Sequence, residues 1–340
     1  MDTHAIASED DFLALIAGSF PNTHESLILG RGDDCAEIAC PPRMAVSTDL
    51  FVEDVHFRSA YFTPFEAGYK ALAVNISDIA AAGGVPLGVS VGLVVPAPFP
   101  RETALGIIDG MAHAARQYGF ALTGGDLSRG DKLSFCVTIW GGPAKTADGL
   151  DTPFLRRGPV SPGDILFVCG RPGLARAGLS ALETHGRAAM GSFPEACAAH
   201  LTPIPLVEAG QALAAIPGCR LMDVSDGLAR DLPRMLEAYG SRCGAAITLP
   251  ESALHPEVAA YARDAGQNPV RFAFSGGEDY ALLGACPISA ISIIQKAIEN
   301  LAGPVPFLPL GTATAGQGII LNGTPLKDRG FDHFTTRSSP

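Results

Sequence analysis

Residues 65–95 read FEAGYKALAVNISDIAAAGGVPLGVSVGLVV. The first part, 65–82, is an alanine-rich run interrupted by Asn75, Ser77 and Asp78, and this pattern predicts a helix. The second part, 85–95, is apolar and carries Gly and Pro residues, which predicts a buried strand. A helix that leads directly into a buried strand indicates an α/β fold.

The segments on either side of this stretch continue the alternation of helices and strands. A first helix should begin at the N-cap Ser8 and run to Phe20. In the N-terminal half we expect strands at 44–51 and 132–140 and a helix at 101–118. In the C-terminal half we expect strands at 165–169, 220–224, 245–249, 272–274 and 280–285, and helices at 173–183, 206–215, 227–239 and 289–301. A polar connection with Gly and Pro, 143–162, lies between the halves, so the sequence predicts two α/β domains, residues 1–145 and 146–340.

Composition excludes several classes of protein. Of the 340 residues, 47% are hydrophobic and 17% charged, which excludes intrinsic disorder. The formal net charge of −11 argues against sequence-independent binding of nucleic acid, because such binding needs clustered Lys and Arg. Nucleotides remain possible ligands, since metal ions and backbone amides can hold their phosphates.

The cysteines and the N-terminal residues indicate the cellular compartment of the protein. The eight cysteines are scattered with no C-x-x-C, so we expect buried thiols in a reducing cytosol and neither zinc ligands nor disulfides. The first residues carry acids where a signal peptide carries bases. No uncharged apolar run reaches the ~18 residues that a membrane span needs. We therefore expect a cytoplasmic protein that contacts no membrane.

Acidic residues occur in short clusters flanked by Gly or Ser, next to apolar segments. Carboxylates that converge without intervening bases repel one another, so a cation should lie between them. Oxygen ligands without His or Cys suit Mg²⁺ better than zinc. A single Asp-Gly is usually a turn or a cap, but six clusters in one chain favour metal binding. The aspartates concerned are Asp33, Asp34, Asp49, Asp78, Asp126, Asp223 and Asp226.

Other catalytic motifs are missing. The sequence has no G-x-x-x-x-G-K-[ST], no dinucleotide-binding G-x-G-x-x-G, no G-x-S-x-G and no H-E-x-x-H. Among the eight histidines, His56 is of interest because it follows Glu53-Asp54 and lies near the cluster at Asp49. We interpret the other seven as structural.

Taken together, the motifs resemble the thiamine-monophosphate kinase family, which belongs to a superfamily with aminoimidazole ribonucleotide synthetase and selenophosphate synthetase. The resemblance extends from Gly30 to Phe334. A reactive Cys beside a Lys, as in selenophosphate synthetase, is absent before Cys35. The motifs are Gly32-Asp33-Asp34-Cys35, Ser47-Thr48-Asp49, Val55-His56-Phe57, the run from Tyr69 to Ala80, Gly124-Gly125-Asp126, Asp223-Val224-Ser225-Asp226-Gly227-Leu228, Ser275-Gly276-Gly277-Glu278-Asp279-Tyr280 and Gly330-Phe331-Asp332-His333-Phe334.

The resemblance implies a fold, a reaction and a set of site residues. The N-terminal domain would bind metal and ATP and pair its sheet with that of a second subunit, forming a barrel across a homodimer; a C-terminal α/β domain would follow. The reaction would transfer the γ-phosphoryl group of ATP to thiamine monophosphate with the help of several Mg²⁺ ions and no protein nucleophile. The implied metal positions are Asp34, Ser47, Thr48, Asp49, Asp78, Asp126, Asp223 and Asp226. The implied ATP contacts are Gly125, Asp126, Arg157 and Ser225, and the implied substrate contacts are His56 and Glu278.

One departure from the family pattern and two alternatives accompany this interpretation. Many relatives carry a large aromatic residue just before the terminal motif, whereas Asp328-Arg329 precede Gly330 here. Stacking on the thiamine ring would then need another residue, and Phe331 is the candidate. The alternatives are another ATP-dependent enzyme of the superfamily, such as a ribonucleotide cyclase, and a non-catalytic protein that binds Mg-nucleotide.

Overall fold

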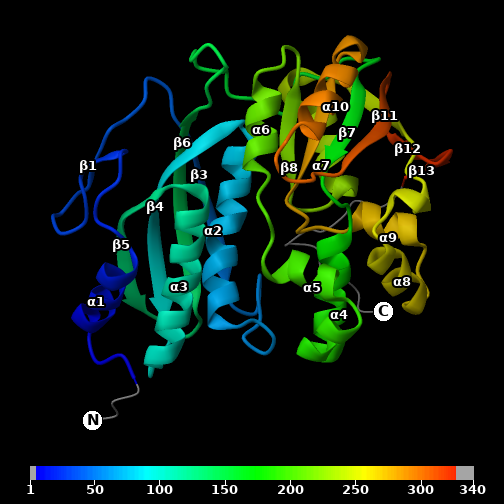
Figure 1. Cartoon of the computed structure of the whole chain (residues 1–340). Coiled ribbons are helices and arrows are strands. Elements are labelled where there is room, and N and C mark those ends of the chain that lie inside the picture. The colour runs from blue at the N-terminus through cyan, green and yellow to red at the C-terminus, as the bar shows by residue number, and fades with distance from the viewer. Residues whose placement is uncertain (1–4, 327–340) are drawn as a thin grey trace. The chain divides into compact units, whose positions relative to one another are not determined.

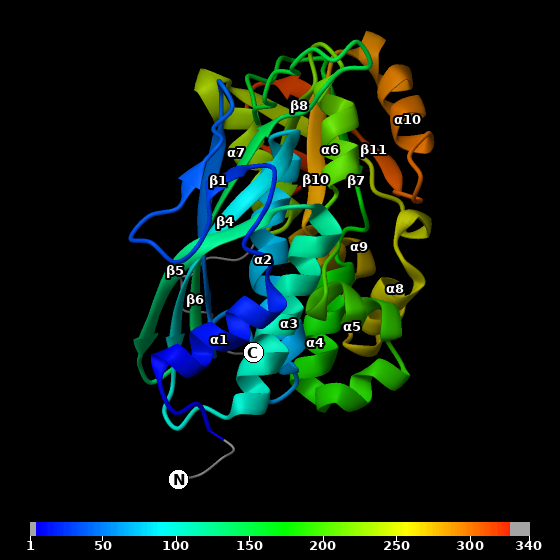
Figure 2. The same cartoon turned by 60° about the vertical axis from the view of Figure 1, so that its left-hand side comes forward.

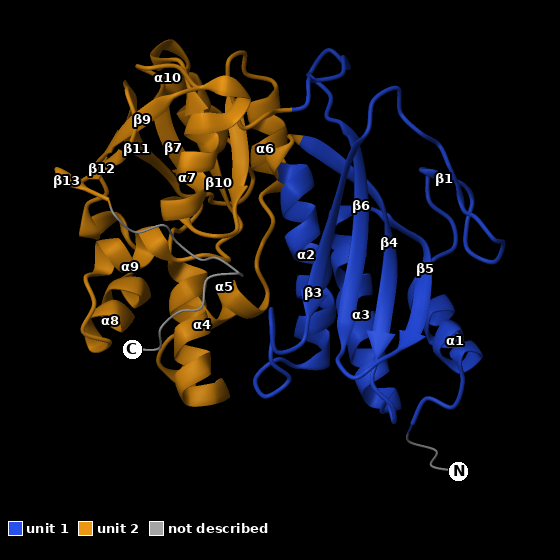
Figure 3. Cartoon of the chain, turned by 180° about the vertical axis from the view of Figure 1, so that it is seen from behind, with its two compact units in different colours: residues 1–80, 84–154 blue, residues 81–83, 155–340 orange. Residues whose placement is uncertain are grey.

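The structure is a computed structural model that describes residues 5–326. The chain forms two compact units, residues 1–80 with 84–154 and residues 81–83 with 155–340 (Figure 3). The main passage from one unit to the other falls between Phe154 and Leu155. Each unit has its own sheet.

The first unit is built on a four-stranded sheet with the order β3-β6-β4-β5. The strands are β3 (Ala45–Val52), β4 (Gly84–Val95), β5 (Ala121–Arg129) and β6 (Ser134–Pro143). All pairs are antiparallel except β4–β5, which is parallel. Parallel neighbours need a crossover, and α3 (Arg101–Tyr118) supplies it.

Helices cover one face of this sheet. They are α2 (Pro64–Ala81) and α3, with α1 (Glu9–Ser19) beside α3 (Figures 1 and 2). Ser8 caps α1 as predicted, its Oγ accepting a hydrogen bond from the Asp11 amide at 3.2 Å. Along β3 the alternation is clear: Phe51 is buried, whereas Val46 and Leu50 on the opposite face are 58% and 60% exposed. The unit therefore has one covered and one open sheet face.

A short hairpin precedes β3. It is formed by β1 (Leu27–Leu29) and β2 (Glu37–Ile38), and the loop between these two strands contains Asp33 and Asp34.

The second unit contains a seven-stranded, mostly antiparallel sheet with the order β13-β12-β9-β11-β7-β10-β8. Leu232, Val224 and Leu283, from a helix and two strands, share one core. The strands are β7 (Ile165–Cys169), β8 (Arg220–Val224), β9 (Cys243–Ile247), β10 (Ala281–Cys286), β11 (Phe307–Ala315), β12 (Ile319–Leu321) and β13 (Thr324–Pro325). The helices are α4 (Leu174–His185), α5 (Pro194–Leu201), α6 (Val207–Ala214), α7 (Leu228–Glu237), α8 (Pro256–Asp264), α9 (Pro269–Ser275) and α10 (Ile291–Glu299), with short 3₁₀ helices at Gly186–Gly191, Ala238–Gly240, Glu251–Ala253 and Ile288–Ala290.

Most predicted elements are confirmed within a few residues, and one is wrong. The run 272–274, predicted as a strand, lies in α9, because Pro269 starts a helix there and the Asn268 side chain accepts a hydrogen bond from the Arg271 amide at 3.0 Å. The strands β1, β2, β5, β11, β12 and β13 and the helices α5 and α8 were not predicted.

The cysteine prediction holds in part. All eight cysteines are free thiols, and five of them are buried. Cys35, Cys40 and Cys136 are exposed, so the expectation of buried thiols is wrong for these three. Cys35 lies in the surface loop between β1 and β2, and Cys136 lies on the open sheet face. Among the residues described, no helix is long and apolar enough to cross a membrane.

Candidate active site

Ser47, Asp49 and Asp78 form a polar cluster between β3 and α2. The Ser47 hydroxyl donates a hydrogen bond to Asp78 Oδ2 at 2.5 Å. Burial, and secondly the negative charge of Asp78, raise the pKa of Asp49 to about 6. The negative charges of Asp49 and Asp78 repel each other, so a cation bound between them would be stabilised.

Asn75, one helical turn before Asp78, adds a buried oxygen to this region. Its Nδ2 donates to the Ala71 carbonyl at 2.9 Å. Its Oδ1 is buried and receives no hydrogen bond from any residue between 5 and 326. Buried polar atoms normally have a partner, so this oxygen has capacity for a further group. The hard oxygen donors of the cluster fit Mg²⁺.

Thr48 and Asp126 lie on the open face of the same sheet. Strand pairing places Leu50, Cys136, Gly92 and Asp126 in one row across β3, β6, β4 and β5. Ser128 Oγ donates to the exposed Asp126 Oδ2 at 2.9 Å, and the hydroxyls of Thr48 and Thr138 are 2.9 Å apart. The sheet therefore divides the predicted metal positions between its two faces.

Gly125 fixes the course of β5 just before Asp126. Its φ of 155° lies in a region that other residues rarely adopt, and a Cβ there would lie 1.9 Å from the Val91 carbonyl oxygen. Only glycine lets β5 approach β4 this closely.

Asp33 and Asp34 are exposed in the loop between β1 and β2. The base of this loop is tied down, because Arg31 and Asn22 exchange two hydrogen bonds of 2.6 and 2.7 Å. The Arg31 guanidinium also donates to the carbonyls of Leu122 at 2.6 Å and Phe20 at 2.8 Å. Both acidic side chains are thus presented from an anchored loop.

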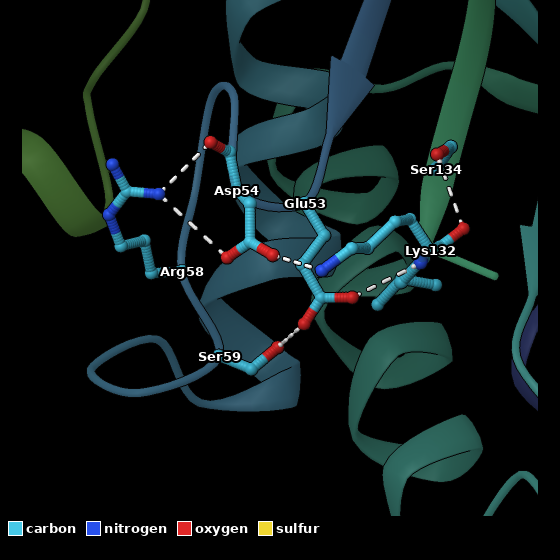
Figure 4. A network of polar contacts seen from close by, with 7 residues as sticks. Glu53, Asp54, Arg58, Ser59, Lys132 and Ser134 are labelled. Carbon is cyan, nitrogen blue, oxygen red and sulfur yellow. Dashed lines mark hydrogen bonds and ion pairs between the residues drawn. The ribbon is translucent and has the colours of Figure 1, made fainter.

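The loop after β3 carries Glu53 and Asp54 and is held by side chains at its ends (Figure 4). Glu53 accepts hydrogen bonds from the Ser59 hydroxyl and, at 3.2 Å, from the Leu133 amide. Asp54, at a positive φ of 64°, forms ion pairs with Lys132 and Arg58. These contacts fix both ends of the segment that contains His56.

His56 is oriented by the strand that precedes it. The Val52 amide donates to His56 Nδ1 at 3.0 Å, which makes Nδ1 an acceptor. The ring is stacked on Phe51, with 6.1 Å between the ring centroids. One ring nitrogen and one face of the ring are therefore occupied by contacts within the protein.

Two glycine-containing loops lie side by side in the second unit. The amides of Glu278 and Tyr280 donate to the carbonyls of Ser225 and Val224, at 2.7 and 3.0 Å. A Cβ at Gly227, whose φ is 95°, would lie 2.5 Å from the Gly276 carbonyl oxygen. The loops 223–227 and 276–280 thus form one backbone-paired platform.

Asp226 on this platform is neutralised by arginines of α7. Its Oδ2 lies 2.7 Å from Arg234 Nη1 and 3.5 Å from Arg230 Nε. Asp231, which sequence reasoning missed, is fully buried and accepts hydrogen bonds from the Asp226 amide at 2.9 Å and from Arg234 at 2.8 Å. Burial is the main cause of the raised pKa of Asp231. Asp223 is half-buried in β8, paired with Leu282 of β10.

Glu278 and Asp279 are held by different helices of the second unit. His200 of α5, also missed from the sequence, donates through Nδ1 to Glu278 Oε2 at 2.8 Å. Asp279 accepts hydrogen bonds from the amides of Gly173, at 2.6 Å, and Ala175, at 3.1 Å, at the start of α4. Burial raises the pKa of Asp279 to about 8. The motifs predict neither contact, because His200, Gly173 and Ala175 are all far from residues 278 and 279 in the sequence.

Arg156 lies 5.9 Å from the centroid of the Tyr239 ring, a cation–π contact that Arg157 does not make with any residue between 5 and 326. Arg157 is exposed and forms no ion pair within residues 5–326. In the same range, no three His, Cys, Asp or Glu side chains form a group that could hold a metal ion. The motif 330–334, with Asp328 and Arg329, lies outside the described residues.

Known proteins resemble this chain over almost its full length. The thiamine-monophosphate kinase of Escherichia coli (strain K12) is 35% identical over 339 residues, covering 95% of this chain and 98% of that protein. The enzyme of that description from Bacillus subtilis (strain 168) is 34% identical over 337 residues, covering 95% and 99%. The chain belongs to the thiamine-monophosphate kinase family. The resemblance seen in the motifs is confirmed, and with it the classification as an enzyme of this kinase family.

The domain and structural matches agree with this membership in the thiamine-monophosphate kinase family. Residues 32–142 match the family described as AIR synthase related protein, N-terminal domain. The structure of a thiamine-monophosphate kinase from Stenotrophomonas maltophilia K279a is 28% identical, with a TM-score of 0.76 over 93% of this chain and 96% of that one. AaThiL, solved in complex with AMPPCP and TMP, is 24% identical with a TM-score of 0.72 over 96% and 97%, and shares the fold.

Proposed function

We propose that this chain phosphorylates thiamine monophosphate with ATP, giving thiamine diphosphate and ADP by direct in-line transfer. The observation that carries the proposal is the likeness to curated thiamine-monophosphate kinases over 95% of the chain. The acceptor is a phosphate that is already an anion near neutral pH, so the reaction needs no general base from the protein. The fold is shared with a protein that has been solved with AMPPCP and TMP.

The main obstacle to this reaction is repulsion between two groups of phosphates. Two unit charges ~4 Å apart cost about 1 kcal/mol in water and about 4 kcal/mol at an effective dielectric constant of 20. Several such pairs meet when ATP approaches a phosphomonoester. Bound Mg²⁺ supplies the positive charge that offsets this repulsion.

We assign the metal positions to the acidic clusters. The pair Asp49 and Asp78 with Ser47 supports this, because its oxygens are hard donors and a cation beside Asp49 would offset the burial and the charge of Asp78 that raise its pKa. Mg²⁺ commonly takes one or two carboxylates, with phosphates and water completing its shell. Small acidic groups therefore suffice when ATP brings its own oxygens. The further positions are Asp34, Thr48, Asp126, Asp223 and Asp226.

ATP and substrate contacts follow the motifs. Gly125 and Asp126 on β5, with Ser225 and Arg157 of the second unit, are proposed to contact ATP. Arg157 can place a planar, permanent positive charge on phosphate, which its exposed guanidinium allows. His56 and Glu278 are proposed to contact thiamine monophosphate, with the Glu278 carboxylate as partner of its cationic ring.

We further propose a cytoplasmic homodimer in which the open sheet face of each subunit meets that of its partner. Val46 and Leu50, 58% and 60% exposed, supply the apolar surface for such a contact. The free thiols of all eight cysteines support a reducing compartment.

A turnover assay tests the function directly. The purified chain is incubated with ATP, Mg²⁺ and thiamine monophosphate, and thiamine diphosphate is followed by chromatography. Product that disappears with EDTA supports both the reaction and the metal. If no thiamine diphosphate forms, but the chain consumes ATP when it is given an aminoimidazole ribonucleotide precursor, a related synthetase would be favoured. Binding of Mg-ATP without turnover on either acceptor would favour a non-catalytic role.

A further inference from the structure

The His200–Glu278 pair stands apart from the ion pairs on the surface of the second unit. The His200 imidazole is fully buried, whereas the Glu278 side chain is 23% exposed. One member of the pair is therefore fixed by packing, and the other reaches the protein surface. The donor is the Nδ1–H group, because a carboxylate can only accept.

The backbone around Glu278 is held at several points. Its own amide is bonded to the Ser225 carbonyl, and the next residue, Asp279, accepts hydrogen bonds from two amides at the start of α4. Glu278 has a φ of 66°, which a non-glycine residue adopts only where its surroundings impose it. The position of its Cα is therefore well determined, and only the side-chain torsions remain to be set.

His200 restricts those torsions. A glutamate has three side-chain torsions and samples many orientations when exposed. A hydrogen bond of 2.8 Å from a buried ring selects one of them and occupies one of the lone-pair directions of the carboxylate. The helices α4 and α5 are in contact, because a Cβ on Gly178 would lie 1.9 Å from the Ala196 carbonyl oxygen. The helices that hold Asp279 and Glu278 therefore form one support.

We propose that His200 is a positioning residue for substrate recognition, holding the Glu278 carboxylate in the orientation that receives a cationic, thiazolium-type ring. The inference rests on the proposed function and adds to it a residue outside all the motifs. His200 acts through Glu278 and does not itself meet the substrate.

The test compares four variants of the full chain in steady-state kinetics. His200→Leu removes the donor, and we expect the KM for thiamine monophosphate to rise about tenfold while the KM for ATP stays within about twofold. His200→Asn keeps an N–H near the position of Nδ1 and should recover most of the lost affinity. Glu278→Gln should raise the same KM. Adding His200→Leu to Glu278→Gln should raise this KM no further, because both changes weaken the same interaction, that of the Glu278 carboxylate with the cationic ring.

A matched control is available in the same unit. His255 Nε2 lies 3.2 Å from Glu195 Oε2, and its Nδ1 accepts a hydrogen bond from the Glu257 amide at the start of α8. His255→Asn removes the contact with Glu195 while asparagine still caps the helix. This variant should leave both KM values unchanged.

Several outcomes overturn the inference. An unchanged KM for thiamine monophosphate in a folded His200→Leu variant does so, and so does an equal rise in both KM values that Asn does not rescue. If His200→Leu fails to fold, the comparison moves to His200→Gln, whose longer side chain misplaces the donor and should be defective where His200→Asn is active; equal activity of these two overturns the inference. A parent chain that neither turns over nor binds thiamine monophosphate in calorimetry overturns the proposed function first.

Discussion

The hydroxyl of Ser47 donates a hydrogen bond to Oδ2 of Asp78, with 2.5 Å between the two oxygens, and so joins β3 to α2. This contact holds the Asp78 carboxylate beside Asp49, whose pKa is raised by burial and by the charge of Asp78. Because the donor is a neutral hydroxyl, this hydrogen bond itself adds no charge to the pair. We expect the charge of the cluster to depend on pH through Asp49.

Replacing Asp78 should abolish the proposed reaction without unfolding the chain. Asp78→Asn keeps an acceptor for Ser47 but removes one charge from the cluster. We expect at least about a 100-fold loss of kcat, since groups that stabilise transition-state charge contribute on this scale, together with weaker binding of Mg²⁺ in calorimetry. Asp109→Asn, at an exposed position of α3, is the control and should match the parent chain. Parent-like turnover in Asp78→Asn would exclude a metal role for this residue.

Asp49 should make the chain less stable at neutral pH than in mild acid. Its pKa is about 6 in the folded chain against an ordinary value of 3.8, so between these values the folded state binds the proton more strongly. The free energy of unfolding therefore falls as pH rises through this interval.

Asp49→Asn should then raise the free energy of unfolding by about 2 kcal/mol at pH 7, allowing for partial exposure, and leave it unchanged near pH 4. Urea denaturation in EDTA at both pH values measures the effect. Asp131→Asn, in the exposed loop between β5 and β6, is the control. A destabilised Asp49→Asn at pH 7 would contradict this account.

Local patterns in the sequence predicted what depends on neighbouring residues. The strand at 44–51, the cap at Ser8 and the helix containing Asp78 are all encoded within a few residues, and the structure confirms them. The run 272–274 was ambiguous because three apolar residues fit a strand or a helix equally well. The proline and asparagine before it decide the outcome.

Relationships between distant segments could not be predicted. No periodicity links His200 to Glu278, 78 positions later, or tells that Asp126 and Asp49 point to opposite faces of one sheet. The latter depends on strand register, which only the pairing of β5 with β4 fixes. Likewise, the ion pairs of Asp226 with α7 appear only once the helix is folded.

Asp231 should stabilise the second unit although no motif contains it. Its buried carboxylate accepts hydrogen bonds from Arg234 and from the amide of Asp226. Asp231→Asn leaves Arg234 without this charge, and we expect a loss of about 3 kcal/mol in urea denaturation. The exposed pair Glu251–Arg263 offers a control, in which Glu251→Gln should change stability by less than about 0.5 kcal/mol. Equal changes in the free energy of unfolding for the two variants would show that the buried ion pair contributes no more to stability than the exposed one.

The open sheet face should be the contact through which two subunits meet. Leu50, 60% exposed, lies in the same row as Asp126, so a partner on this face would also cover a proposed ATP and metal position. Leu50→Arg places a charge on the exposed apolar surface that β3 contributes to this face. It should convert a dimer to a monomer in light scattering, with at least about a tenfold rise in the KM for ATP.

Leu105, 37% exposed on α3, lies on a helix that covers the other face. Leu105→Arg should remain dimeric and active, because it adds the same charge away from the proposed contact. A parent chain that is a fully active monomer, or a Leu50→Arg variant that stays dimeric, would place the subunit contact elsewhere or remove it. Loss of ATP affinity together with loss of the dimer would instead tie the open face to catalysis, since Asp126 and Thr48 share that face with Leu50.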